Sequence, residues 1–213
     1  FSAINAAIKN LRLNNDSLTG ELLLNTKERS GFEVKSLLAN VRMDPTLMAF
    51  SNLSIETPNS KIGNAFSMGY EYFTDDMADF VNKVRMEGNI TNSMVSLKDI
   101  AFFAPALKGE NISLRLNGKV EGPVKNLVAK EMRIEYGNLT ALSGELQIEG
   151  LPEVEKTSYR LTNAKVISAA KDLYTLLPSL KKTLGIDLVP MGAISFKGDV
   201  MARGNNMDIK GLL

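Results

Sequence analysis

The chain has 213 residues and a formal charge of +1, from 25 basic and 24 acidic side chains, and it contains no histidine, cysteine or tryptophan. This charge balance argues against a nucleic-acid binder, because affinity for phosphates rests on a basic surface. Without histidine and cysteine the chain lacks the commonest general base, the thiol nucleophile and the usual zinc ligands, so we expect no enzyme activity, no cofactor and no bound metal.

Apolar and polar residues alternate along most of the chain, as is typical of strands with one apolar face. The first two predicted strands cover residues 4–13 and 18–24, with a turn rich in asparagine between them. In the next strand, over 32–43, the alternation changes phase, which predicts a bulge near Lys35 and Ser36.

The alternation continues to an aromatic strand over 66–72, and helical spacing then begins near residues 74–84. There the apolar side chains fall at i, i+3, i+4 and i+7, which predicts one short amphipathic helix. Thr74 is expected to cap it, with Asp75 and Asp76 at the positive end of the helix dipole.

The clearest strand signal lies between residues 110 and 151. Three alternating runs are separated there by Gly122-Pro123 and Gly137-Asn138, which are turn sequences. This part of the chain is therefore predicted to be an antiparallel meander.

A second helical segment is predicted at 168–185, where leucines recur at helical spacing. Pro178 should kink it and Gly185 should end it. We favour packing of this segment against the sheet over the alternative that it lies on a membrane, because Lys171, Lys181 and Lys182 make only a sparse basic face.

A strand pattern that runs into a glycine recurs at Gly88, Gly118 and Gly198. Glycine inside a strand marks a bulge, a bend or a close backbone approach, so repeated glycines are expected to curve the sheet. We therefore expect β-branched replacements at these three positions to flatten or destabilise it.

The fold class that follows is mainly β: one elongated, curved antiparallel sheet with about two short amphipathic helices. Residues 1–213 are expected to form a single segment of a longer protein, with helical insertions near 74–84 and 168–185. No apolar run is long enough to span a bilayer.

The polar residues that could form a catalytic, metal or glycosylation site are explained more simply by surface, helix-start or turn positions. Glu21 and Glu145 occupy matching places in a repeated Leu-Ser/Thr-Gly-Glu-Leu motif, and the alternation predicts that both are solvated surface carboxylates. The acids at 75, 76 and 79 are explained by a helix start and lack a calcium-loop pattern. The glycosylation-type sequons are interpreted as turn chemistry, and their asparagines are Asn15, Asn52, Asn89, Asn111 and Asn138.

Several short motifs together resemble the TamB and AsmA-like family of envelope-biogenesis proteins. They are LTGEL at 18–22, SGFEV at 30–34, LSIETPNS at 53–60, LKDIAFFAPAL at 97–107, GKVEGPVKNL at 118–127, LTALSG at 139–144 and GAISFKG at 192–198. The resemblance implies a β-taco or half-pipe groove whose concave face is apolar. It also implies a location in the periplasm of a diderm bacterium, with the full-length protein anchored in the inner membrane.

The function implied by this resemblance is lipid transport that supports outer-membrane biogenesis, protein assembly and secretion. The groove would carry phospholipid acyl chains between the inner and outer membranes. Its partners would be those chains, adjacent segments of the same protein and an outer-membrane barrel that other parts of the protein would contact. The alternative is a structural or adhesive β-solenoid with a solid apolar core and no lipid cargo.

The residues expected to face lipid share one phase of the alternation. They are Leu22, Leu114, Leu116, Met132, Ile134, Leu146, Ile148 and Phe196.

Overall fold

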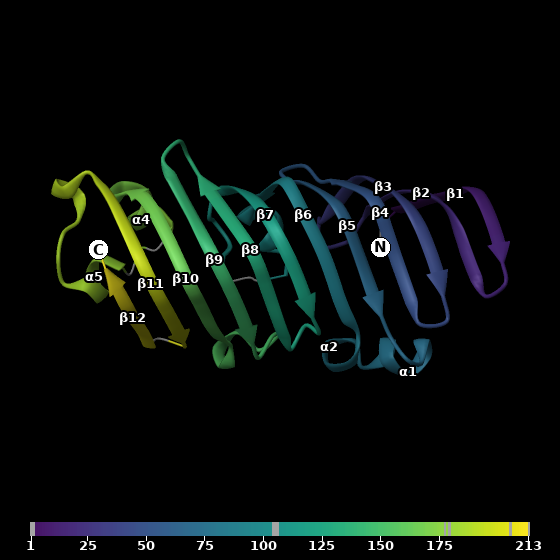
Figure 1. Ribbon diagram of the computed structural model, residues 1–213. Helices are drawn as coiled ribbons and strands as arrows, with labels where there is room; N and C mark the ends of the chain where they lie inside the picture. Colours follow the sequence, from purple (N-terminus) through teal and green to yellow (C-terminus); the bar gives the residue numbers. More distant parts are fainter. Residues whose placement is uncertain (1–2, 104–106, 177, 179, 205, 213) are drawn as a thin grey trace.

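Twelve antiparallel strands form one sheet in the computed structural model, and each strand pairs with its neighbours in the sequence (Figure 1). The structure describes residues 3–103, 107–176, 178, 180–204 and 206–212. The strands are β1 (Ala3–Asn14), β2 (Ser17–Lys27), β3 (Glu33–Asp44), β4 (Leu47–Glu56), β5 (Lys61–Gly69), β6 (Arg85–Ser96), β7 (Ser113–Gly122), β8 (Asn126–Tyr136), β9 (Thr140–Glu149), β10 (Ser158–Ala169), β11 (Ala193–Arg203) and β12 (Asn206–Leu212). The predicted fold class, an elongated and curved antiparallel sheet, is confirmed.

The helices are short and lie in the connections between strands. They are α1 (Phe73–Ala78), α2 (Phe80–Lys83), α3 (Leu97–Ile100), α4 (Ala170–Leu176) and α5 (Leu180–Leu184), with 3-10 turns η2 (Val154–Lys156) and η3 (Val189–Met191). None of the helices in the described part of the chain has the length and hydrophobicity needed to cross a bilayer.

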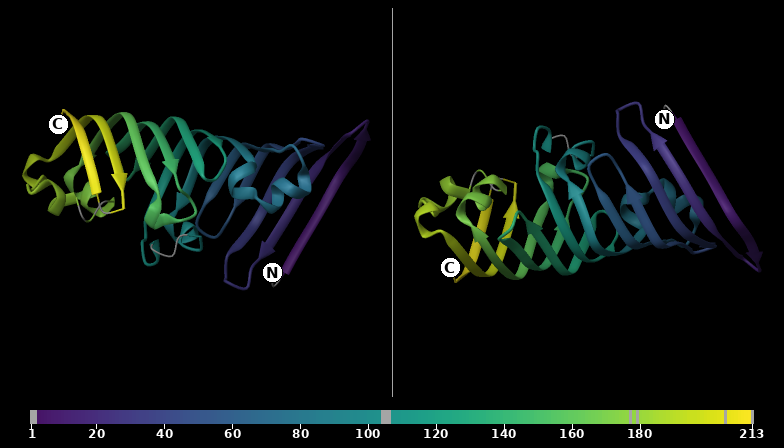
Figure 2. Two further views of the ribbon diagram at one scale, coloured as in Figure 1. Left: turned by 90° about the horizontal axis from the view of Figure 1, so that it is seen from below. Right: turned by 90° about the horizontal axis from the view of Figure 1, so that it is seen from above.

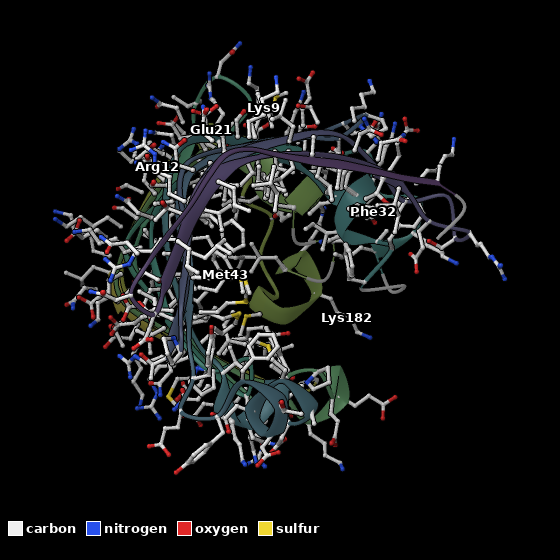
Figure 3. All side chains as sticks on the ribbon, turned by 90° about the vertical axis from the view of Figure 1, so that its right-hand side faces the viewer. Lys9, Arg12, Glu21, Phe32, Met43 and Lys182 are labelled. Carbon is white, nitrogen blue, oxygen red and sulfur yellow. The ribbon has the colours of Figure 1, made fainter. Side chains whose placement is uncertain are left out.

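Seen end-on, the sheet has a C-shaped cross-section (Figure 3). Met43 points into the hollow of the C, whereas Lys9, Arg12 and Glu21 point outward. Figure 2 shows that the strands run obliquely to the long axis and that β1 and β12 lie at opposite ends. The molecule is therefore a trough whose two end strands each have one edge unpaired within this chain.

The curvature coincides with a row of β-bulges. In β1, β4, β6, β8 and β10 the pairing register shifts so that one extra residue stands against the neighbouring strand. The residue at each shift has a positive φ between 47° and 53°, and these residues are Asn10, Asn52, Asn92, Glu131 and Asn163. Bulges bend a strand and increase its twist, so this row accounts for the bend of the sheet.

Asparagine fits the bulges because it tolerates the left-handed conformation better than most residues. The strands opposite carry no extra residue there and present Gly20, Gly118 and Gly144 at the bulges of β1, β8 and β10. The bend was expected at glycines such as Gly118, but the extra residues lie in the strands opposite, and these glycines make room for them. Asn52 likewise lies in a strand bulge and not in the turn that its sequon suggested.

The bulge predicted near Lys35 and Ser36 is confirmed. Leu24 pairs with Leu37 and Thr26 pairs with Val34, so two residues of β3 stand against one residue of β2. The predicted aromatic strand over 66–72 starts and ends earlier than expected, because β5 runs from Lys61 to Gly69. Tyr70 lies beyond it, buried, and donates a hydrogen bond to the carbonyl oxygen of Asp44 at 3.1 Å.

The helix predicted near 74–84 is two helices, α1 and α2, that meet at Asp79. Thr74 does not cap them, since Tyr72 occupies the N-cap without a side-chain hydrogen bond. Asp76 instead accepts the backbone N–H groups of Glu71 and Tyr72, at 2.7 and 3.1 Å, and is buried.

The segment predicted at 168–185 contains α4 and α5, which lie on either side of Pro178, and Gly185 follows α5 with a φ of +68°. One helix kinked at Pro178 was expected, whereas the structure has two separate helices; the expected end at Gly185 is confirmed. Ala170 of α4 packs with Leu188 and Ile194 in a small buried cluster under β10 and β11, joined by Leu173 and Tyr174.

Candidate functional site

The inner side of the sheet is lined by apolar side chains, and we call it the concave face. It carries Met43, Phe50, Phe66, Leu116, Ile134 and Leu142 together with every strand residue that shares their phase in the pairing register. Residues directly opposite each other on paired strands point to the same side, so the register assigns each strand residue to a face.

The register places all of the residues expected to face lipid on the concave face. Leu116 pairs with Ile134, which pairs with Leu142, and this row continues through Val166 to Phe196. Met132 opposes Gly144 in the bulge row that forms the floor of the concave face. These residues therefore belong to one continuous surface across β7 to β11.

The remaining residues expected to face lipid extend this surface. Leu146 and Ile148 pair with Leu161 and Tyr159 of β10. Leu114 pairs with Val95 of β6. Leu22 lies near the other end of the sheet, opposite Ala39.

No charged side chain lies on the concave face among the strand residues that the structure describes. The charges of the strands lie on the convex face, where several pair across neighbouring strands, for example Lys119 with Glu131 at 2.8 Å and Arg115 with Glu135 at 3.4 Å. Such exposed pairs contribute at most about 1 kcal/mol each. Glu21 and Glu145 are on this face and exposed, as predicted.

The concave face is not packed as a closed core. Of the residues expected to face lipid, Met132 is buried and the others are partly exposed. The chain has an accessible surface of 13494 Å², whereas a compact monomer of 23.3 kDa is expected to have about 9,700 Å². Much of the additional accessible area arises because the sheet is open on its concave side. Apolar side chains there stay in contact with solvent.

Polar side chains on the concave face are few and mostly occupied. Ser93 bonds to the backbone of Gly63, and Thr140 bonds to Ser168 and to Asp172 of α4, each at 2.7 Å. Since these hydroxyls already have partners, the surface offers little for recognising a polar ligand. It suits a ligand that is itself apolar.

One margin of the trough is held together by a buried aspartate in α3. Thr57 and Ser60, in the turn between β4 and β5, donate to Asp99 Oδ2 at 2.5 Å each, and the Asn59 amide donates to Asp99 Oδ1 at 2.8 Å. Farther along the same margin, Phe102 and Phe103 pack edge-on against Phe32, with ring centroids 5.5 and 5.0 Å apart. The segment from α3 to Phe103 thus contacts two turns that lie far from it in the sequence, the β4–β5 turn and the β2–β3 turn.

Burial of Asp99 alone would raise the pKa of its carboxyl group, but the hydrogen bonds from Ser60, Thr57 and Asn59 outweigh burial and hold this pKa below its usual value. The folded state therefore favours the ionised form. The stability gained from Asp99 is fully present above the unfolded-state pKa of about 3.9 and is lost as the pH falls through the folded-state pKa.

Replacing Asp99 with alanine should lower the free energy of unfolding by about 2 kcal/mol, because three buried or half-buried donors lose their acceptor. Asp99→Asn should lose less at neutral pH, and its stability should decline less on acidification. Thermal melts at neutral pH and at about pH 3 measure both effects. Asp75→Ala, at an exposed position of α1, is the matched control, and equal melting temperatures for Asp99→Ala and this control would contradict the assigned role.

Comparison of the chain with protein-family models, curated proteins and solved structures found no match in any of the three.

Proposed function

We propose that the concave face binds the acyl chains of phospholipids and forms part of a path along which they pass between two membranes. The observation that carries this proposal is the continuous, partly exposed apolar surface without charged side chains over the described strands. An acyl chain that lies on such a surface removes apolar area from water on both sides, at roughly 25 cal/mol per Å² or about 0.8 kcal/mol per methylene.

The shape of the trough suits an extended ligand. The concave face crosses every strand from β1 to β12, so a chain can lie along it at many positions. At neighbouring-strand spacings of about 4.8 Å, twelve strands give a path on the order of 50 Å, longer than one acyl chain. A continuous surface of this kind favours movement along the path over capture at one point.

The cellular setting rests on the resemblance to AsmA-like proteins. We propose that the protein lies in the periplasm of a diderm bacterium, that the full-length protein is anchored in the inner membrane, and that it supports outer-membrane biogenesis, protein assembly and secretion. Adjacent segments of the full-length protein are expected to pair with the free edge of β1, whose residues are all exposed, and to extend the path. Contact with an outer-membrane barrel would be made by parts of the protein outside these residues.

The solenoid alternative requires a solid apolar interior. Such an interior would bury its large side chains, whereas Phe50, Phe66, Leu116 and Ile134 stay partly exposed. This exposure favours the lipid path. No observation on the described residues favours an adhesive role.

Mass spectrometry of organic extracts tests the proposal directly. The chain, purified without detergent from a diderm host, should carry phospholipid in near-stoichiometric amounts, because an empty concave face would expose apolar area to water. A fluorescent fatty acid added to the delipidated chain should bind and be displaced by phospholipid. A chain free of lipid that also fails to bind the fluorescent acid would overturn the proposal.

A further inference from the structure

Four methionines form an unbroken row across the concave face. Met43 pairs with Met48, Met48 pairs with Met68, and Met68 pairs with Met86, so the row crosses β3 to β6 in direct register. Directly opposed residues have Cβ atoms about 4.5–5.5 Å apart, which brings neighbouring side chains into contact range. Any apolar residue would satisfy the strand alternation, so the alternation alone does not explain why all four positions are methionine.

The row follows one margin of the trough. Met43 and Met48 flank the turn between β3 and β4, and Met68 and Met86 flank the connection that contains α1 and α2. All four side chains are partly exposed, and Met43 points into the hollow in Figure 3. Methionine that only filled gaps in a core would be buried, so these side chains form a surface.

Space for rearrangement lies beside the row. Phe50 and Phe66 stack next to it with ring centroids 6.5 Å apart, and Gly88 stands opposite Phe66. A Cβ on Gly88 would lie 3.8 Å from the Phe66 ring and 3.9 Å from Val120 Cβ, which are ordinary contacts. The glycine therefore leaves room of about one small side chain next to flexible neighbours.

Methionine is unbranched, has three rotatable side-chain bonds and recurs at surfaces that bind ligands of varied shape. Leucine of similar volume is branched and adapts less. We propose that the methionine row, with Phe66 and Gly88 beside it, is an adaptable subsite that accepts kinked acyl chains, with a cis double bond or a methyl branch, as well as straight ones. This inference rests on the proposed function and adds the ligand class to it.

Competition between two fatty acids of equal carbon number, stearate and oleate, against a fluorescent fatty acid tests the subsite in the full chain. The wild-type chain should bind both acids within about threefold of each other. The variant Met43→Leu, Met48→Leu, Met68→Leu, Met86→Leu should keep its affinity for stearate and bind oleate about tenfold more weakly. The control carries Met94→Leu and Met201→Leu, both on the convex face, and should match the wild type.

The outcomes separate the two proposals. An unchanged ratio of the two affinities in the fourfold variant overturns the adaptable subsite and leaves acyl-chain binding intact. Failure of the wild-type chain to bind either acid overturns acyl-chain binding, and the subsite with it. Exchange of methionine for leucine conserves volume and is usually well tolerated. If circular dichroism shows that the fourfold variant is unfolded, two double variants provide the same comparison: one carries Met43→Leu with Met48→Leu, the other Met68→Leu with Met86→Leu.

Discussion

Replacing Ile134 with glutamate is expected to leave the sheet folded while it blocks the passage of apolar chains along the concave face. Ile134 lies between Leu116 and Leu142 in the register and is partly exposed, so a carboxylate there can reach water from the open side of the trough. We expect a loss of about 1–2 kcal/mol in the free energy of unfolding. A charge buried in a solid core without a partner would cost several kcal/mol and unfold the chain.

The same carboxylate should weaken acyl-chain binding strongly, since a bound chain would have to strip its water. Thermal melting measures the fold, displacement of a fluorescent fatty acid measures binding, and outer-membrane integrity in cells that carry the full-length variant measures function. Ile167→Glu is the matched control, because Ile167 is 54% exposed and lies on the convex face of β10. It should behave as the wild type in all three assays.

The three measurements assign the result to one explanation. A folded Ile134→Glu chain that neither binds fatty acid nor supports the membrane favours the lipid path. An unfolded chain favours the packed solenoid. A folded chain with full activity removes Ile134 from the path.

The second large effect is expected at Gly118, opposite the bulge of β8. Its φ is +149°, and a Cβ there would lie 3.1 Å from Met132 Cα and 3.2 Å from the backbone oxygen of Lys130. Gly118→Ala should therefore strain the backbone and push two central strands apart. We expect a loss of roughly 3 kcal/mol, or about 10 °C in melting temperature for a domain of this size.

Gly88→Ala is the internal control for Gly118. A Cβ at Gly88 makes only ordinary contacts, and alanine reduces the freedom of the unfolded chain, so stability should stay level or rise by up to about 1 kcal/mol. Equal effects at the two positions would show that the bulge row does not need glycine. At Gly198 a Cβ would lie 2.1 Å from the backbone oxygen of Lys210, so replacement there should detach the end strand β12.

These glycines show how far a local pattern reaches. The recurring motif predicted the same role for Gly88, Gly118 and Gly198, since each follows the same alternating run. Only the pairing between strands separates them, because the neighbour that a Cβ would meet belongs to another strand. The asparagine bulges were missed for the same reason, although the positive φ of Asn10, Asn52, Asn92 and Asn163 matches a known tolerance of that residue.

The Asp99 cluster is a second feature that no local pattern could reveal. Ser96 caps α3 by accepting the N–H of Lys98 at 3.3 Å, so the Asp99 carboxylate takes no part in that cap. The donors to Asp99 come from residues 57–60, about forty positions earlier in the chain. In the sequence, Thr57, Asn59 and Ser60 are ordinary turn residues. Only the folding of the strands between this turn and Asp99 brings them to its carboxylate.

The sequence by itself determined where most of the strands run and which side of each is apolar, because side chains alternate with a period of two whatever the strand pairs with. It also determined the two helical intervals and the end at Gly185, which depend on neighbouring residues alone. The tertiary structure decided where the sheet bends, which turns α3 connects and how much of the apolar side stays open, because these depend on backbone pairing and side-chain contacts between residues far apart in the chain.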